Sequence, residues 1–271
     1  MLLSEIYKLA DELAPKTLSA ECCQTYGYYD NSGILIDTGE DIKGIVFSLD
    51  LSNAAIEKAI KEKANLIITH HPAIYGKIGD IRVDDNTLLG GKIVKCIQNG
   101  ISLISMHLNL DFAKGGTDES LMEGICLASG ETEGAGTGLR CMQPLSIGSY
   151  GRAYDIKKTT LKTLCQNMQK EFSSKKILFY GEEEKEIKRI ASFCGAGADE
   201  RAVVFAKEQG ADAIVSSDFK HHILALAQEL GLSVIVMTHY ASECYGFKKY
   251  YEKICRQVAV PCVYHTDENL L

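Results

Sequence analysis

Asn65-Leu-Ile-Ile-Thr-His-His-Pro72 joins a short apolar run to a pair of histidines. Residues 66–68 are apolar and mostly β-branched, and they lie between a helical pattern and a proline, which predicts a buried strand of a parallel sheet. Ligands of open α/β sheets bind beyond the carboxyl ends of strands, where His70 and His71 are expected. Neighbouring side chains of an extended chain point to opposite sides. The pair could therefore serve two centres, such as two metal ions, although one buried and one surface histidine is an equally reasonable interpretation.

Length and composition indicate a globular protein. The chain has 271 residues, 46% hydrophobic and 24% charged, which fits one large α/β domain or two small ones. The net charge of −7 gives no basic field to attract nucleic acid or an anionic membrane. No segment approaches the roughly 20 apolar residues of a membrane span. Glu5, Asp11 and Glu12 interrupt the apolar N-terminal region, so no signal peptide is predicted.

The ten cysteines are scattered and include no Cys-x-x-Cys pair. This spacing disfavours both a disulfide framework and a thiolate zinc site. We therefore expect reduced thiols that behave as small hydrophobic side chains, and a cytoplasmic protein.

Apolar segments alternate along the chain in a pattern that predicts two α/β halves. The main expected strands cover residues 42–49, 66–68, 101–106, 176–180, 187–194, 213–215 and 232–237. Residues 129–151 are rich in glycine without a helical or strand period, which predicts a connection between domains. The expected domains are 1–128 and 129–271, and residues from about 232 onward could pack back on the first.

The order of segments repeats within the chain. Three pairs of segments resemble one another, namely 41–48 and 186–193, 65–68 and 212–215, and 101–106 and 232–237. The pattern predicts a duplicated α/β unit, although independent βαβ units also resemble one another.

The repeat brings further histidines to strand ends. In each half the third strand is followed by a histidine and, four residues later, by a carboxylate: His107 with Asp111, and His239 with Glu243. Four residues make about one helical turn, so each pair can share a face. Imidazole and carboxylate donors together suit Zn, Mn, Fe or Co. With His70 and His71 there are six candidate ligands, which favours two ions about 3.5–4 Å apart.

Two other motifs allow more than one interpretation. Asp218 and His222 are also four residues apart and follow the second-half strand that corresponds to the His70 strand. They could form a further functional pair, or be a helix-start charge and an exposed histidine. Gly195-x-Gly197 before a helix could cradle phosphate, but a tight turn explains the two glycines as well.

Together the motifs resemble those of the Nif-three-like family, many members of which carry the name GTP cyclohydrolase type 2. The resemblance covers residues 4–268 and depends on five segments: Asp30-Asn31-Ser32-Gly33, Thr69-His70-His71-Pro72, His107-x-Asn109-Leu110-Asp111, Gly115-Gly116-Thr117-Asp118 and Thr238-His239-Tyr240-x-x-Glu243. It implies two interlinked, duplicated α/β domains with mostly parallel sheets, a dinuclear metal cleft between them, and often a hexameric ring. The implied ligands are His70, His71, Asp111, His239 and Glu243, and His107 matches a motif histidine near the metals.

The chain departs from the family pattern at a few positions. Thr238 stands where the family often has glycine, and Ser217 precedes Asp218 where Gly-Asp is usual. Neither change removes an implied ligand. The long inserted middle domain of some members is absent.

The candidate ligands predict two divalent transition-metal ions, and the family resemblance implies a hydrolase that acts on a small molecule, such as the nucleotide GTP. His107, Asp218 and His222 are the candidate catalytic residues for proton transfer. A metal-binding scaffold or regulator without catalysis is the alternative. Asp118 is expected to cap the helix after Gly116, an effect of about 1 kcal/mol. A homohexamer is expected, with neither a membrane nor nucleic acid as partner.

Overall fold

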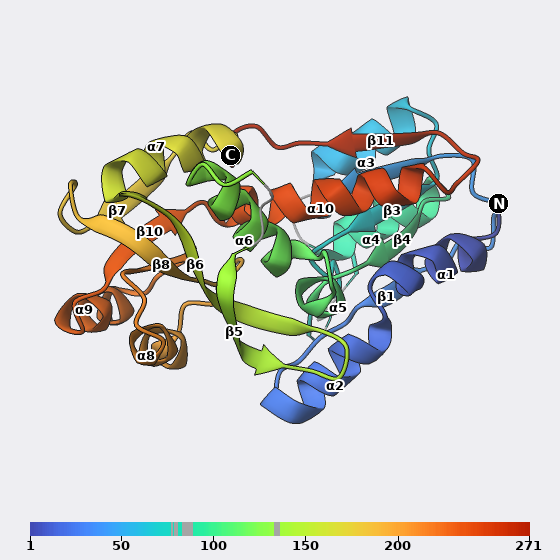
Figure 1. Cartoon of the computed structure of the whole chain (residues 1–271). Helices are drawn as coiled ribbons and strands as arrows, with labels where there is room; N and C mark the ends of the chain where they lie inside the picture. The colour runs from blue at the N-terminus through green and yellow to red at the C-terminus, as the bar shows by residue number, and fades with distance from the viewer. Residues whose placement is uncertain (77, 79–80, 83–88, 133–135) are drawn as a thin grey trace. The chain divides into compact units, whose positions relative to one another are not determined.

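The computed structural model describes residues 1–76, 78, 81–82, 89–132 and 136–271 of the chain (Figure 1). The chain forms two compact units, one of residues 1–113 and 247–266, the other of residues 114–246 and 267–271. Each unit combines a β-sheet with helices, so the predicted α/β class is confirmed. The domain division 1–128 and 129–271 stays a prediction, because compact units need not be domains that fold alone.

The sheet of the first unit has five strands among the described residues, in the order β1-β4-β3-β2-β11. Their bounds are β1 Gly33–Ile36, β2 Ile45–Ser48, β3 Leu66–Thr69, β4 Ser102–Ser105 and β11 Cys262–His265. The last four are parallel neighbours, and β1 is antiparallel to β4. Every residue of β2, β3 and β4 is buried, as the apolar run at 66–68 predicts for a parallel sheet covered on both faces.

The helices of this unit are α1 (Leu3–Leu13), α2 (Lys16–Tyr26), α3 (Asn53–Lys61), α4 (Leu89–Gln98), the short α5 (Leu108–Phe112) and the part of α10 (His239–Cys255) from Phe247 onward. Of these, α3 and α4 connect neighbouring parallel strands in βαβ order. Ile56 of α3 and Ile93 of α4 pack in one cluster with Ile67 of β3. Ser52 caps α3 by accepting a hydrogen bond from the Ala55 N–H at 3.0 Å, as expected of an N-cap serine.

The second unit has a mixed sheet with the order β5-β6-β8-β9-β10-β7. The bounds are β5 Thr137–Pro144, β6 Ser149–Thr160, β7 Ile177–Tyr180, β8 Glu186–Ser192, β9 Ala213–Ser216 and β10 Ser233–Met237. Strands β8, β9 and β10 are parallel to one another. Strand β7 pairs antiparallel with β10, β6 pairs antiparallel with β8, and β5 pairs antiparallel with β6. Parallel strands thus form the centre of this sheet and antiparallel strands its edges.

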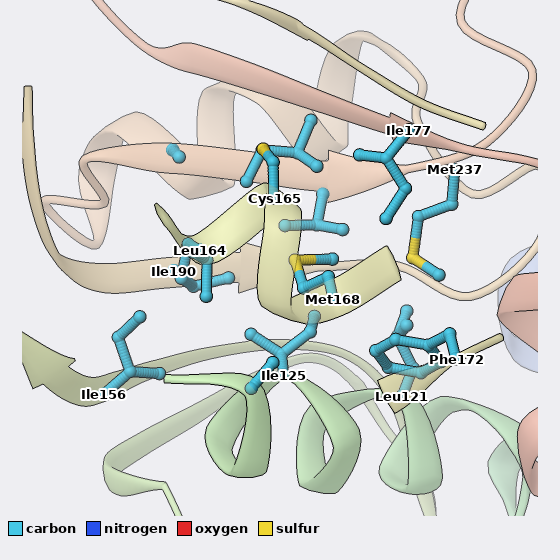
Figure 2. Packing of buried hydrophobic residues seen from close by; sticks show 14 of the residues in the cluster. Leu121, Ile125, Ile156, Leu164, Cys165, Met168, Phe172, Ile177, Ile190 and Met237 are labelled. Carbon is cyan, nitrogen blue, oxygen red and sulfur yellow. The ribbon is translucent and has the colours of Figure 1, made fainter. Parts of the chain in front are cut away.

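Helices cover both faces of the second sheet. The cluster drawn in Figure 2 packs Leu121 and Ile125 of α6 (Thr117–Ala128) and Met168 of α7 (Leu161–Glu171) against strand residues such as Ile190. A second cluster joins α8 (Glu200–Glu208) and α9 (His221–Glu229) to the other face. The large apolar area that these clusters remove from water is the main stabilising term of the unit.

The two sheets share a topology. In the first unit an antiparallel edge strand precedes three parallel strands in the order β1-β4-β3-β2, and in the second unit β7-β10-β9-β8 repeats that arrangement. Helices α3 and α8 connect corresponding strands, as do α4 and α9. The predicted duplication therefore agrees with the strand order as well as with the sequence.

The glycine-rich stretch is not a linker, and that expectation is wrong over residues 137–151. Strands β5 and β6 form an antiparallel hairpin there, with Thr137 opposite Asp155. Gly138, with a φ of +61°, lies in the register shift of β5, and Gly151 has a φ of +71°. Glycine is the residue that adopts such angles without strain, so these glycines serve the hairpin. Residues 133–135 lie outside the described ranges.

Asp118 is not a helix cap, contrary to the prediction. It is fully buried, and its Oδ2 accepts hydrogen bonds from the Gly151 N–H at 3.0 Å and from the Arg152 guanidinium. Its Oδ1 accepts from the Cys194 N–H at 3.0 Å. Gly116 is the N-cap of α6, without a side-chain bond. Burial lowers the pKa of Arg152, but the charges of Asp118 and Glu119 outweigh it and raise the pKa overall, so the guanidinium stays charged.

Among the described residues, no helix has the length and apolar character needed to cross a bilayer.

The Asp118–Arg152 pair should carry much of the stability of the second unit. Asp118→Asn leaves a buried guanidinium without its countercharge, so we expect a loss of about 3 kcal/mol in the free energy of unfolding. Asp155→Asn is the matched control, because Asp155 pairs with Arg189 at 2.5 Å but is 49% exposed. It should cost about 1 kcal/mol or less. Urea unfolding measures both, and equal losses would contradict the buried pair's role.

Candidate metal centre

The turn after β3 holds the histidine pair of the first unit in place. The backbone N–H groups of His70 and His71 both donate to the carbonyl of Leu49, at 3.1 and 2.9 Å. The Thr69 hydroxyl lies 2.8 Å from the Ser105 hydroxyl at the neighbouring strand end, and also donates to the His71 carbonyl at 2.8 Å. The ends of the parallel strands are therefore tied together where both imidazoles begin.

His70 is fully buried, and its environment fixes its tautomer. Its Nδ1 lies 2.7 Å from the Met106 carbonyl oxygen. A carbonyl can only accept, so Nδ1 carries the proton and, in the neutral ring, Nε2 keeps a lone pair. That Nε2 lies 3.4 Å from Oδ1 of Asp111, on α5. The imidazole nitrogen and the carboxylate oxygen thus face each other across a distance that suits two ligands of one ion.

His71 and His107 repeat this arrangement with carboxylates as acceptors. The Nδ1 of His71 lies 2.8 Å from Oδ1 of Asp50, which follows β2. The Nδ1 of His107 lies 2.8 Å from Oδ1 of Asp30, which precedes β1. A neutral ring that donates from Nδ1 directs the lone pair of Nε2 the other way.

Asp30 is itself held firmly as an acceptor. The hydroxyls of Ser19 and Ser32 donate to its Oδ2 at 2.5 and 2.6 Å. Burial alone would raise the pKa of Asp30, but hydrogen bonds from His107, Ser19 and Ser32 outweigh it and lower the pKa to about 2. Asp30 therefore stays a carboxylate near neutral pH and can fix the orientation of His107.

The three histidines of the first unit lie side by side. The ring centroid of His70 is 5.0 Å from that of His71 and 5.4 Å from that of His107. His70, His107 and Asp111 each offer one ligand atom, and these atoms lie within 4.8 Å of one another. The first unit thus gathers four predicted site residues, with His71 completing the group.

The second unit contains the other predicted pair. His239 begins α10, and its Nε2 lies 3.0 Å from Oε1 of Glu243, so the two share a helix face as predicted. The Nδ1 of His239 lies 2.5 Å from Oδ2 of Asp218, which follows β9. Asp218 is thus in contact with a candidate ligand, as Asp50 and Asp30 are in the first unit. His222 lies exposed in the first turn of α9.

Gly195 leaves room for the Glu243 carboxylate. A Cβ added at Gly195 would overlap Oε1 of Glu243 and lie 3.4 Å from Nε2 of His239. The Gly195 N–H donates to the Ser242 hydroxyl at 3.2 Å, which fixes the loop against α10. Asp199 caps the start of α8 by accepting from the Ala202 N–H at 2.9 Å. The loop therefore requires glycine at position 195 for two reasons, the steric clearance beside Glu243 and a backbone φ of +60°.

The donor set fits a transition-metal ion. Each motif histidine has its Nδ1 next to an oxygen acceptor, which is how proteins orient histidine ligands. Nitrogen and oxygen donors without thiolate suit Zn, Fe, Mn or Co. These buried histidine and carboxylate groups could hold a metal ion. Sequence reasoning did not identify Asp30 and Asp50 as acceptors; the one signal was the place of Asp50 at a strand end and of Asp30 in a motif.

Fold and donor set define a two-unit α/β protein with a candidate metal centre. The family model Duf34/NIF3 (NGG1p interacting factor 3) matches residues 1–268, and the chain belongs to this family. A Clostridium perfringens relative named "GTP cyclohydrolase 1 type 2 homolog" is 31% identical over 94% of this chain and 91% of its own length. A Methanocaldococcus jannaschii relative of the same name is 29% identical over 93% of this chain and 94% of its own.

Solved structures show the same fold. Reduced HcgD from Methanocaldococcus jannaschii has a TM-score of 0.78 and 26% identity, over 97% of both chains. A Staphylococcus aureus hypothetical protein has a TM-score of 0.79 and 22% identity, over 97% of this chain and 95% of its own. The predicted family is confirmed by the family model over residues 1–268.

Gly195→Ala should impair metal binding through Glu243. The new methyl group would displace the carboxylate, and a φ of +60° adds strain of about 1 kcal/mol. Gly210→Ala is the matched control, because Gly210 has a φ of +69° but no atom within 4 Å of the added Cβ. Both variants should lose similar stability, while elemental analysis after dialysis should find less metal only in Gly195→Ala. Equal metal content in the two would show that the clearance is unimportant.

Proposed function

We propose that the protein is a dinuclear metal-dependent hydrolase that acts on a nucleotide such as GTP. The observation that carries the proposal is the repeated anchoring of histidine Nδ1 by an oxygen acceptor, at His70, His71, His107 and His239. The name shared by the relatives supports a nucleotide substrate. Hydrolysis needs a water molecule that a metal ion activates. Nitrogen and oxygen donors suit a metal ion in that role better than a metal ion that transfers electrons.

The proposed ligands are His70, His71 and Asp111 from the first unit and His239 and Glu243 from the second. Two divalent ions, when bound, would supply Lewis acidity and a water of lowered pKa. Zn, Fe, Mn and Co all suit this donor set. Asp111 and Glu243 would offset the positive charge, because unbalanced charge in a buried site is expensive.

Among the chain's own groups, His107 is the proposed proton acceptor. Asp30 holds its Nδ1 proton, so the incoming proton would go to Nε2, and the resulting imidazolium would be stabilised by the Asp30 carboxylate. Asp218 would orient His239 through the short hydrogen bond to Nδ1. A direct part for Asp218 or His222 in proton transfer stays a prediction.

The homohexamer implied by the family resemblance belongs to this proposal, and light scattering of the purified protein would measure it. The cytoplasmic location likewise stays a prediction of the sequence.

The purified, reconstituted protein should bind about two transition-metal ions per chain. Glu243→Gln should lose a large part of this metal, since the amide keeps the shape of the side chain but not its charge. Glu200→Gln is the matched control, because Glu200 is an exposed first-turn acid of α8. Metal content and melting temperature, with and without added metal, are the measurements. If Glu243→Gln behaves like Glu200→Gln in both conditions, Glu243 is only a helix-start acid.

Turnover of GTP should rise with metal content, which separates a hydrolase from a metal-binding scaffold. His107→Asn should lower kcat by about 100-fold, a typical effect of removing a proton-transfer group, while metal content changes little. His265→Asn is the control in the same unit, because His265 lies in strand β11 and is not one of the proposed site residues. Product chromatography follows the reaction. A fully metallated protein without turnover on any nucleotide would favour the scaffold.

A further inference from the structure

Two exposed tyrosines form an aromatic pair in the first unit. The rings of Tyr29 and Tyr75 lie edge to face, with centroids 5.1 Å apart and an interplanar angle of 78°. Tyr29 is 53% exposed and Tyr75 is 55% exposed. Tyrosine is an amphipathic side chain of few rotatable bonds, so a fixed, exposed pair of them is a good surface for a ligand.

The pair is held in place by hydrogen bonds between two segments far apart in sequence. The Tyr75 hydroxyl donates to the carbonyl of Tyr29 at 3.1 Å, which ties the far end of one ring to the backbone of the other residue. The Asn31 side chain donates to the carbonyl of Ile74 at 2.7 Å. The rings therefore have little conformational entropy to lose when a ligand binds.

The aromatic pair also adjoins the candidate metal centre. The ring of Tyr75 lies edge to face with that of His107, at a centroid distance of 6.3 Å and an angle of 83°. Between Tyr29 and Asn31 in the chain lies Asp30, the acceptor of the His107 Nδ1 proton. Three consecutive residues thus contribute to the surface beside His107. Tyr29 provides a ring, Asp30 orients His107, and Asn31 holds the segment that carries Tyr75.

We infer that Tyr29 and Tyr75 bind the planar heteroaromatic ring of the substrate and hold the rest of that molecule beside His107. Stacking of a base on an aromatic side chain is sequence-tolerant, because every base has a π face. The inference deepens the proposed function and rests on it only for the identity of the reacting centre. It names a substrate class, a ring-bearing compound, and the residues that select it.

The contribution of the ligand's heteroaromatic ring to binding can be measured with two matched compounds. Guanosine 5′-monophosphate and ribose 5-phosphate share the sugar and the phosphate, so any metal–phosphate contact is common to both. Calorimetric titration of the full-length, metal-loaded protein should show the nucleotide binding at least about tenfold more tightly, a difference that stacking on one ring can supply. Equal affinity, or no measurable binding of the nucleotide, would overturn the inference.

Three variants assign the effect to the pair. Tyr75→Leu and Tyr29→Leu should each weaken nucleotide binding about tenfold, and leave ribose 5-phosphate binding unchanged. Tyr75→Phe keeps the ring and should stay within about threefold of the unchanged protein. Tyr180→Leu is the matched control, because Tyr180 is a 42% exposed tyrosine on β7 of the second unit. A leucine variant with normal nucleotide affinity would refute the assignment.

The outcomes separate this inference from the proposed function. Ring-dependent binding without turnover would keep the tyrosine site and remove the hydrolase. Turnover with full metal content in both leucine variants, at unchanged KM, would keep the hydrolase and remove the tyrosine site. A change of molecular mass in light scattering, with nucleotide affinity unchanged, would show that the pair is a contact between copies of the chain and would also overturn the inference.

Discussion

The orientation of the imidazole rings is the constraint on which the candidate site depends. A histidine that carries its proton on Nδ1 can offer the lone pair of Nε2 to an ion, and an oxygen acceptor at Nδ1 fixes that tautomer and the direction of the ring. Each motif histidine has such an acceptor. His70 uses a backbone carbonyl, whereas His71, His107 and His239 use carboxylates. Asp30 also accepts hydrogen bonds from two serine hydroxyls, so further side chains fix the acceptor of His107.

Parallel strands explain why such residues meet. Carboxyl ends of neighbouring parallel strands lie at one edge of a sheet, so residues that follow β2, β3 and β4 converge although they are far apart in the chain. The second unit repeats the strand order and brings Asp218 to His239 by the same rule. Duplication of one α/β unit thus places a set of candidate ligands at the strand ends of each unit, with an oxygen acceptor for each of their histidines.

Close packing around the second-unit pair adds a steric requirement to this electrostatic one. Gly195 leaves space for the Glu243 carboxylate, and the preceding residue, Cys194, donates its N–H to the buried Asp118. Asp118 in turn neutralises Arg152 inside the unit. A buried ion pair, a backbone turn and a candidate ligand are therefore connected through two adjacent residues. Stability and the geometry of the site depend on the same contacts in this part of the chain.

The sequence by itself determined the α/β class, the main strands and the His-x-x-x-carboxylate pairs, because apolar runs and helical spacing are local properties. It misjudged residues 137–151, since glycines that serve positive-φ positions in a hairpin look like those of a linker. Only the tertiary structure decided that Asp118 pairs with Arg152 and that Asp30 meets His107, 77 residues further along the chain. Such contacts depend on which strand ends the fold brings together, and no local pattern records them.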